Sequence, residues 1–169
     1  MSSNSTPSSI NKHRGEGEVI AHDIVWNARK IPLSYSRHIT GHFVPGGGRS
    51  AIPFESHLER SAIAALVNLH VTQEVVAQPV TVTYSATGSR RTYTPDLFVR
   101  MDYVPRALSA LGWEMTTLVE VKPACVLNRH ANRIRFKLRV AEIATGLAGV
   151  CLTENDFPLL QLASKEGAL

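Results

Sequence analysis

The sequence has few of the features that mark secreted or membrane-bound proteins. It contains only two cysteines in 169 residues, too few for the disulfide framework of a small secreted domain. No apolar run approaches the roughly 18 residues of a membrane span, and residues 1–7 are Ser/Asn-rich, without the apolar segment of a signal peptide. We therefore expect a cytoplasmic protein that does not enter a membrane, with Cys125 and Cys151 reduced and buried in the core.

Nucleotide-binding and zinc-binding signatures are also missing. Three glycines follow Pro45 in a segment without a strand or helix period. A phosphate-cradling loop also requires a Lys-Ser/Thr pair, which is missing. His38 and His42 have i,i+4 spacing, yet no paired cysteines accompany them and they lie in a segment, residues 34–50, that we expect to be a loop. A zinc site is therefore not predicted.

The excess of positive charge is modest, with a formal net charge of +4 and a pI of about 9.3. It fits a nucleic-acid partner without requiring one. Five basic residues fall between positions 129 and 139, and no acid follows until Glu142. Such a run is usually a solvated helix face, but beside a metal site it favours phosphate contact. The candidates for phosphate contact are Arg37, Arg49, Arg129, Arg133, Arg135, Lys137 and Arg139.

The chain divides into three parts by composition. We expect a disordered tail over residues 1–17, an arm and loop over 18–53, and one compact core over 54–169. The arm contains short apolar stretches, among them Ile24-Val25-Trp26, that would pack on the core.

The core pattern predicts an α/β fold with a mixed central sheet flanked by helices. Residues 128–145 are ambiguous, because apolar and basic residues alternate there as in a strand. Their length and the helix-favouring continuation to Gly146 indicate a helix that ends in a glycine cap. The expected elements are helices over Phe54–Asn68, Asn128–Thr145 and from Asp156 onward, and strands over Val75–Tyr84, Arg91–Arg100, Met115–Val121 and Ala148–Thr153, with a turn over Thr87–Ser89.

Carboxylates and one lysine mark the ends of these elements. Pro95-Asp96 closes one strand, Glu120-Val121-Lys122 closes another, and Glu59 lies on the first helix. Residues two apart on a strand point to the same face, so Glu120 and Lys122 project together.

These side chains suit Mg²⁺ chemistry. The carboxylates of Asp96 and Glu120, with the Val121 carbonyl, are hard oxygen ligands of the kind Mg²⁺ prefers, and Glu59 would complete the cluster or hold a second ion. Glu55, one turn earlier, is a rival for that place. Lys122 would orient a water or stabilise the transition state. Each motif alone is common at protein surfaces, but the ordered set predicts a metal-dependent phosphodiesterase.

The motif order resembles the PD-(D/E)xK nuclease superfamily, and more closely the TnsA endonucleases of heteromeric bacterial transposases. The resemblance covers about residues 43–157. Five segments carry it in sequence, namely Ser56–Arg60, Val75–Pro79, Tyr93–Val99, Val119–Ala124 and Leu152–Glu154.

The resemblance implies a restriction-endonuclease-like core and a bacterial enzyme that uses Mg²⁺, for which Mn²⁺ can substitute. Such an enzyme cleaves the 5′ strands at transposon ends, while a partner DDE transposase cuts and joins the 3′ ends. Glu59, Asp96 and Lys122 would be catalytic, and Glu120 stands where the family has Glu or Gln.

The resemblance also implies partners: double-stranded DNA at transposon ends, the DDE transposase and an AAA+ regulator. The family prototype contacts the regulator through a C-terminal domain, whereas this chain ends at Leu169, so we expect that contact to be absent, formed elsewhere or supplied by another chain. Two alternatives stay open. One is another nuclease of the superfamily, such as a Holliday-junction resolvase or a defence endonuclease; the other is a catalytically silent DNA-binding assembly subunit.

Overall fold

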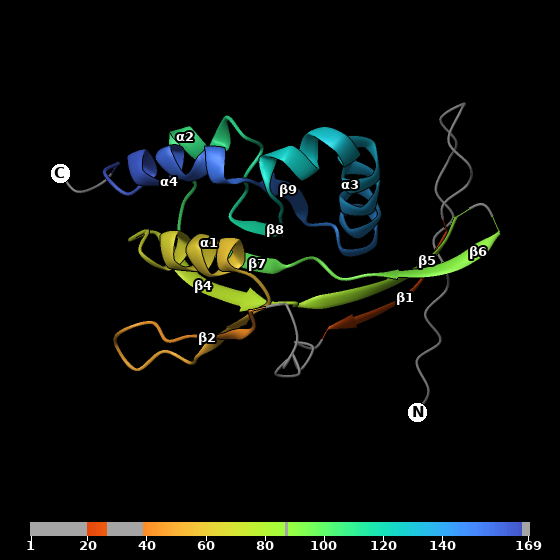
Figure 1. The fold of residues 1–169 in the computed structure, drawn as a ribbon, viewed down its shortest axis with the longest axis horizontal. Helices are drawn as coiled ribbons and strands as arrows, with labels where there is room; N and C mark the ends of the chain where they lie inside the picture. The colour runs from red at the N-terminus through yellow and green to blue at the C-terminus, as the bar shows by residue number, and fades with distance from the viewer. Residues whose placement is uncertain (1–19, 27–38, 87, 167–169) are drawn as a thin grey trace.

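The computed structural model describes residues 20–26, 39–86 and 88–166. The expected disordered tail, Arg37, His38 and Thr87 lie outside these ranges. The described chain forms a mixed α/β structure (Figure 1). Its main sheet has the strand order β4-β7-β8-β9, in which β8 and β9 are parallel and the other pairs antiparallel. These strands span Thr72–Ala77 (β4), Leu97–Met101 (β7), Thr116–Val121 (β8) and Ala148–Leu152 (β9).

A second, antiparallel sheet has the strand order β1-β5-β6. Its strands are β1 (Ile20–Trp26), β5 (Val80–Ala86) and β6 (Ser89–Tyr93). The arm joins the core because residues 20–26 pair with β5. The expectation that Ile24-Val25-Trp26 packs its apolar side chains on the core is wrong, because all three are exposed.

A small hairpin of β2 (Gly41–Phe43) and β3 (Ile52–Phe54) precedes the first helix. The loop expected over residues 34–50 is therefore wrong at residues 41–43, and the first helix does not begin at Phe54. Strands of three residues are too short to show an alternating hydrophobic pattern, which is why the sequence did not reveal them.

Two long strands expected from the sequence are each divided in two by a proline. Residues 75–84 are split at Gln78-Pro79 into β4 and β5, and residues 91–100 are split at Thr94-Pro95-Asp96 into β6 and β7. Because proline has no N–H to donate to a ladder, both strands of this hairpin lose their pairing at the same level. The Gln78 N–H donates to the Asp96 carbonyl at 2.8 Å across the break. The hairpin thus leaves one sheet and enters the other.

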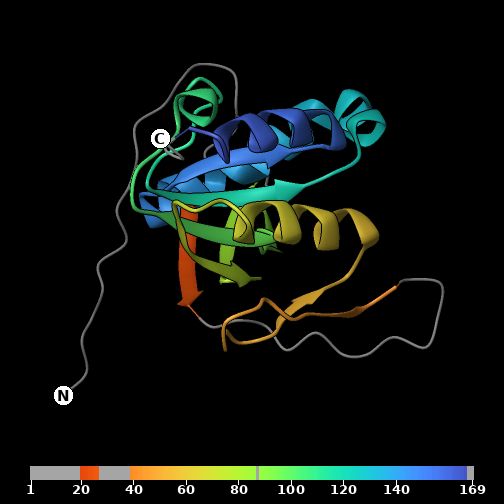
Figure 2. The ribbon, with the colours of Figure 1, turned by 90° about the vertical axis from the view of Figure 1, so that its left-hand side faces the viewer.

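The helices lie on both faces of the main sheet (Figure 2). The first face carries one large core, in which α1 packs on β4 and on α4, and α2 packs on α4. Its central side chains include Ile63, Leu66, Val99, Val119 and Leu160. The helical bounds are His57–Val67 (α1), Arg106–Ser109 (α2), Ala124–Thr145 (α3) and Phe157–Ala163 (α4), with a 3₁₀ turn, η1, over Glu154–Asp156.

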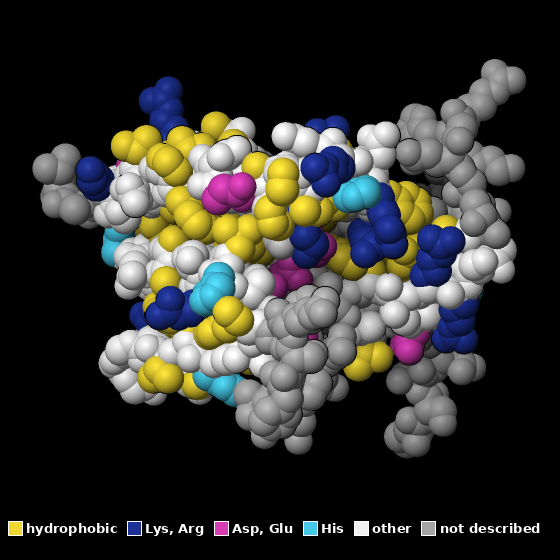
Figure 3. All heavy atoms as spheres, viewed as in Figure 1, with side chains coloured by type: hydrophobic (Ala, Val, Ile, Leu, Met, Phe, Trp, Pro, Cys, Tyr) yellow, Lys and Arg dark blue, Asp and Glu magenta, His cyan; other side chains and the backbone are white. Residues whose placement is uncertain are grey.

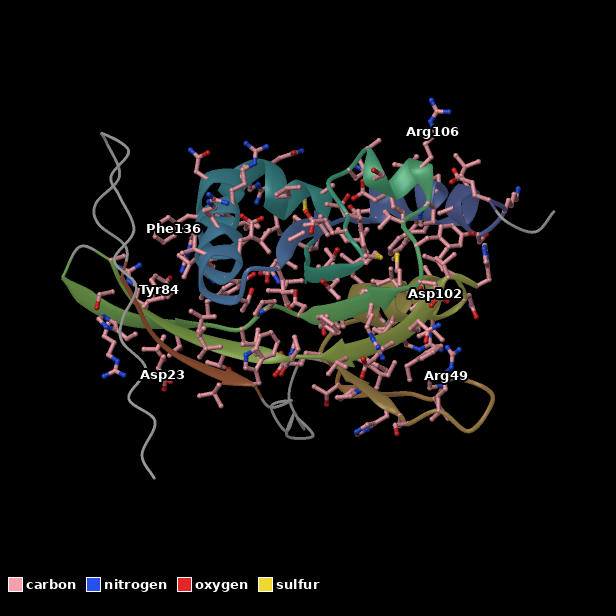
Figure 4. All side chains as sticks on the ribbon, turned by 180° about the vertical axis from the view of Figure 1, so that it is seen from behind. Asp23, Arg49, Tyr84, Asp102, Arg106 and Phe136 are labelled. Atoms are coloured by element: carbon pink, nitrogen blue, oxygen red, sulfur yellow. The ribbon has the colours of Figure 1, made fainter. Side chains whose placement is uncertain are left out.

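The opposite face is covered by α3, which forms a second core with the β1-β5-β6 sheet. Tyr84 of β5 and Phe136 of α3 meet edge to face, with ring centroids 6.0 Å apart (Figure 4). Leu118 belongs to this core, whereas Val119 and Val121 belong to the first. The two-residue period of β8 therefore directs Glu120 to the α3 side of the sheet.

The interpretation of residues 128–145 as a helix is confirmed, although α3 begins four residues earlier, at Ala124, and is interrupted at His130 (φ −128°, ψ 23°). Ile134, Leu138 and Ala141 are buried at helical spacing. The expectation that Cys125 is buried is wrong, because this residue lies exposed in the first turn of α3. Cys151 is partly buried, which raises the pKa of its thiol to about 11.

No helix of the described chain has both the length and the apolar character that crossing a membrane requires.

The end of α3 gives a test of the fold. Gly146 caps the helix with a left-handed φ of 74°, and its N–H donates to the Glu142 carbonyl at 2.8 Å. We expect Gly146→Ala to lower the free energy of unfolding by about 1 kcal/mol, because a Cβ is strained at this φ. Gly46→Ala is the control, since its backbone is not left-handed and a Cβ there meets nothing within 4 Å. Urea denaturation of both variants decides the point, and equal stability would contradict the cap.

Candidate active site

The break in the long hairpin brings Asp96 to the end of β8. Asp96 directly precedes β7, and its Oδ2 accepts hydrogen bonds from the Val121 N–H at 2.8 Å and from Lys122 Nζ at 2.9 Å. Among the described residues, the other oxygen of Asp96 has no hydrogen-bond partner. The backbone contact fixes the carboxylate against β8 and leaves one oxygen available for a ligand.

The ammonium group of Lys122 contacts three oxygen atoms of the site. Its Nζ lies 2.9 Å from Asp96 Oδ2, 3.0 Å from Glu120 Oε1 and 3.1 Å from the Val121 carbonyl oxygen. The side chain of Glu120 is 5% exposed and that of Asp96 17% exposed. The structure therefore brings together four of the predicted site residues, and Glu120 and Lys122 project to one face as their spacing predicted.

Tyr93 is a site residue that the sequence analysis did not single out. It is the last residue of β6 and is buried, and its hydroxyl donates to Glu120 Oε2 at 2.8 Å. Lys137 of α3 lies over its ring, 5.4 Å from the centroid. Tyr93 is the one buried residue in an otherwise exposed strand, but Glu120 lies 27 positions away, and no local spacing could have paired the two.

Burial and neighbouring charges shift the pKa values of both Glu120 and Lys122. Burial raises the pKa of the Glu120 carboxyl, and the charge of Asp96 adds to that rise. Burial lowers the pKa of the Lys122 ammonium, but the charges of Asp96 and Glu120 more than offset it, so the net shift is upward. Lys122 is consequently a cation at neutral pH, which suits electrostatic stabilisation and excludes it as a base in this arrangement.

Glu59 lies close to the site but does not touch it. Its carboxylate accepts hydrogen bonds from the Glu55 N–H at 2.8 Å and from the Ser56 hydroxyl at 3.0 Å, and Ser56 caps α1 through the Glu59 N–H. Burial raises the pKa of Glu59, and the charge of Asp96 contributes to the rise. Glu59 thus has a local structural role at the start of α1, and the charge of Asp96 affects its pKa.

The donor set fits a divalent cation. In the described chain, no group of three or more His, Cys, Asp or Glu side chains is close enough to hold a metal ion. Asp96, Glu120 and the Val121 carbonyl nevertheless converge on one positive nitrogen, each within 3.1 Å. All three are hard oxygen donors directed at a shared point, as Mg²⁺ requires. The three are also the oxygen ligands predicted from the sequence, without Glu59.

Basic side chains lie beside the acidic cluster. Figure 3 shows acidic side chains at the centre of one face and Lys and Arg side chains next to them, over α3. Of the five predicted phosphate contacts on α3, Arg129, Arg133 and Arg135 are exposed and form no ion pair with a described residue. Arg139 instead pairs with Glu142 at 3.1 Å, and Lys137 lies over Tyr93.

Arg49 is not part of this surface. It lies between β2 and β3 and lines a cavity of about 460 Å³ against β4. Figure 4 places it at the opposite end of the molecule from Phe136 of α3. Arg49 and the basic residues of α3 therefore lie on separate parts of the described structure.

Compared with known proteins, the sequence matches no family model and no curated protein.

The raised pKa of Glu120 gives a stability prediction with a definite sign. A carboxyl group whose pKa is higher in the folded protein than in the unfolded chain stabilises the fold at acid pH. This contribution is lost as the pH rises through the pKa of the folded state. Ionised Glu120 therefore costs stability at pH 7, and Glu120→Gln, which keeps an acceptor for Tyr93, should raise the Tm there by some 2–4 °C for each kcal/mol recovered.

We expect the gain in Tm to shrink as the pH falls to 4, where Glu120 itself becomes protonated. Thermal unfolding followed by circular dichroism between pH 4 and 8 measures it. The exposed Glu114 serves as control, since Glu114→Gln should leave the Tm difference near zero at every pH. A lower Tm for Glu120→Gln at pH 7 would show that the Lys122 contact outweighs the burial of the charge.

Proposed function

We propose that this protein is a Mg²⁺-dependent DNA endonuclease with a restriction-endonuclease-like core. The observation that carries the proposal is the convergence of Asp96, Glu120 and the Val121 carbonyl on Lys122 Nζ at the end of β8. Carboxylate and carbonyl oxygens suit a divalent cation that assists phosphodiester hydrolysis, and a lysine beside them can stabilise developing negative charge. Exposed arginines of α3 beside this cluster favour a polyanionic substrate.

We further propose a TnsA-type role, in which the protein cleaves the 5′ strands at transposon ends together with a DDE transposase and an AAA+ regulator. The five motif segments support this narrower role, because they occur in order and two of them contain Asp96 and Lys122. A comparison of substrates separates it from a resolvase, which would cut four-way junctions symmetrically without a transposase. A silent assembly subunit would bind DNA but never cleave it, even with its partners.

Each residue of the site has its own role in the proposed reaction. Asp96, Glu120 and the Val121 carbonyl would hold the divalent cation, which supplies Lewis-acid stabilisation of charge on the phosphate. Lys122, kept protonated by the two carboxylates, donates hydrogen bonds to the reacting phosphate or to the attacking water and offsets developing negative charge. The backbone N–H of Val121 keeps Asp96 oriented, and the arginines of α3 bind the phosphates that flank the cleaved bond.

Calorimetric titration of Mn²⁺ tests the site directly. We expect the wild type to bind Mn²⁺ and Asp96→Asn to lose at least about tenfold in affinity, because a ligand charge is removed. Asp102→Asn is the matched control, since Asp102 is exposed and contacts Gln73 away from the site.

Lys122→Met separates binding from catalysis. It removes the repulsion between the ammonium and the metal ion, so we expect Mn²⁺ to bind at least as tightly as to the wild type while DNA cleavage with the transposase is abolished. A wild type that binds no Mn²⁺, either alone or with DNA bound, would overturn the proposed function.

The basic face of α3 gives a second test. Replacing Arg129, Arg133 and Arg135 together by Gln should weaken DNA binding and flatten the dependence of log K on log salt concentration by about 0.9 for each phosphate that is no longer neutralised. Arg106→Gln is the control, because Arg106 lies exposed on α2, away from α3 (Figure 4). Fluorescence anisotropy between 50 and 200 mM salt measures both. An unchanged slope in the triple variant would remove α3 from the DNA interface.

A further inference from the structure

The two oxygens of Glu120 face different surroundings. Oε1 lies 3.0 Å from the partly exposed Nζ of Lys122, where the other candidate ligands converge. Oε2 accepts the hydrogen bond from the buried Tyr93 hydroxyl at 2.8 Å. Glu120 is itself buried, so its carboxylate cannot rotate freely to present both oxygens to one point.

Tyr93 is held in place from several sides. It pairs with Val82 across the β5–β6 ladder and belongs to the core beneath α3 with Leu118. The ammonium of Lys137 over its ring adds a cation–π contact from α3. A buried ring with these neighbours has little freedom to move its hydroxyl away from Glu120.

We infer, on the basis of the proposed function, that Tyr93 is a positioning residue that sets the metal selectivity of the site. By donating to Oε2, Tyr93 holds the carboxylate with Oε1 at the shared point beside Lys122 and disfavours binding of a cation through both oxygens. Ca²⁺ is bound with six to eight oxygens and often takes both oxygens of a carboxylate, whereas Mg²⁺ demands a compact octahedron and accepts single oxygens. A Glu120 that offers one oxygen therefore favours Mg²⁺ and its octahedral analogue Mn²⁺ over Ca²⁺.

The test compares Mn²⁺ and Ca²⁺ affinities by calorimetry in the wild type, Tyr93→Phe and Tyr84→Phe. Tyr93→Phe keeps the ring and frees Oε2, so the ratio of the Ca²⁺ to the Mn²⁺ dissociation constant should fall about tenfold, as for loss of other residues that orient a metal ligand. Tyr84 is the matched control, because it is equally buried in the same core and its hydroxyl makes no hydrogen bond with a described residue. Tyr84→Phe should leave the ratio unchanged.

The outcomes separate this inference from the proposed function. Suppose that Mn²⁺ binding depends on Asp96 but the ratio of the Ca²⁺ to the Mn²⁺ dissociation constant is the same in Tyr93→Phe and the wild type. That result would overturn the role of Tyr93 and leave the nuclease proposal standing. A wild type that binds no Mn²⁺ even on DNA would overturn both. An equal fall in the ratio for Tyr84→Phe would attribute the effect to core packing and overturn the inference.

A measurement on the wild type covers the case in which Tyr93→Phe does not fold. Infrared difference spectra with Mn²⁺ report whether a carboxylate binds through one oxygen or two. When both proteins are saturated with Mn²⁺, the bands absent from Glu120→Gln belong to Glu120. A one-oxygen signature for Glu120 is expected. A two-oxygen signature would overturn the inference.

Discussion

The positive charge of Lys122 is the constraint on which the site depends. Two carboxylates that share a largely buried space repel each other and lose their hydration, and each effect favours protonation. The ammonium between Asp96 and Glu120, together with the Val121 N–H, permits both to approach one point. Because Asp96 is the last residue of the hairpin break and Lys122 follows β8, the same contacts also fasten the hairpin to the main sheet. Removing the ammonium without supplying another cation would leave buried charge uncompensated.

The paired prolines explain how this constraint arises from an ordinary hairpin. Had β4 and β5 continued as one strand, Asp96 would lie within a ladder with its side chain fixed by the pleat. Pro79 and Pro95 interrupt both strands together, and the Gln78 N–H bonds the Asp96 carbonyl across the gap. Gln78 adopts a positive φ of 47° to do so, a conformation that non-glycine residues rarely adopt and that is often retained at functional sites. The bend places Asp96 between two sheets, where β8 delivers Glu120 and Lys122.

Features that depend on residues close together in the sequence could be predicted, whereas contacts between distant segments could not. The shared direction of Glu120 and Lys122 follows from the two-residue period of a strand, and the helix over 128–145 follows from its length and its glycine end; both predictions are confirmed. Contacts between distant segments left no local pattern. The bond from Tyr93 to Glu120, the exposure of Cys125 and the separation of Arg49 from α3 depend on how the elements pack. The prolines were visible, but their alignment across the hairpin required the register of the two strands.

The balance of charge argues for a cation at this site. The charge of Asp96 acts on both Glu59 and Glu120, and Lys122 is the one basic side chain among the described residues that forms ion pairs with Asp96 and Glu120. When all are ionised, one ammonium leaves two negative charges without a partner. Burial raises the pKa values of the Glu59 and Glu120 carboxyls, and the charge of Asp96 adds to each rise, so protonation is one way to remove this excess of negative charge. A divalent cation would neutralise the same excess at neutral pH without protonation, and it would do so beside a helix whose exposed arginines carry the opposite surplus. The acidic cluster is thus better matched by a cation than by the basic face of α3. The basic face of α3 is better matched by a phosphate than by the acidic cluster.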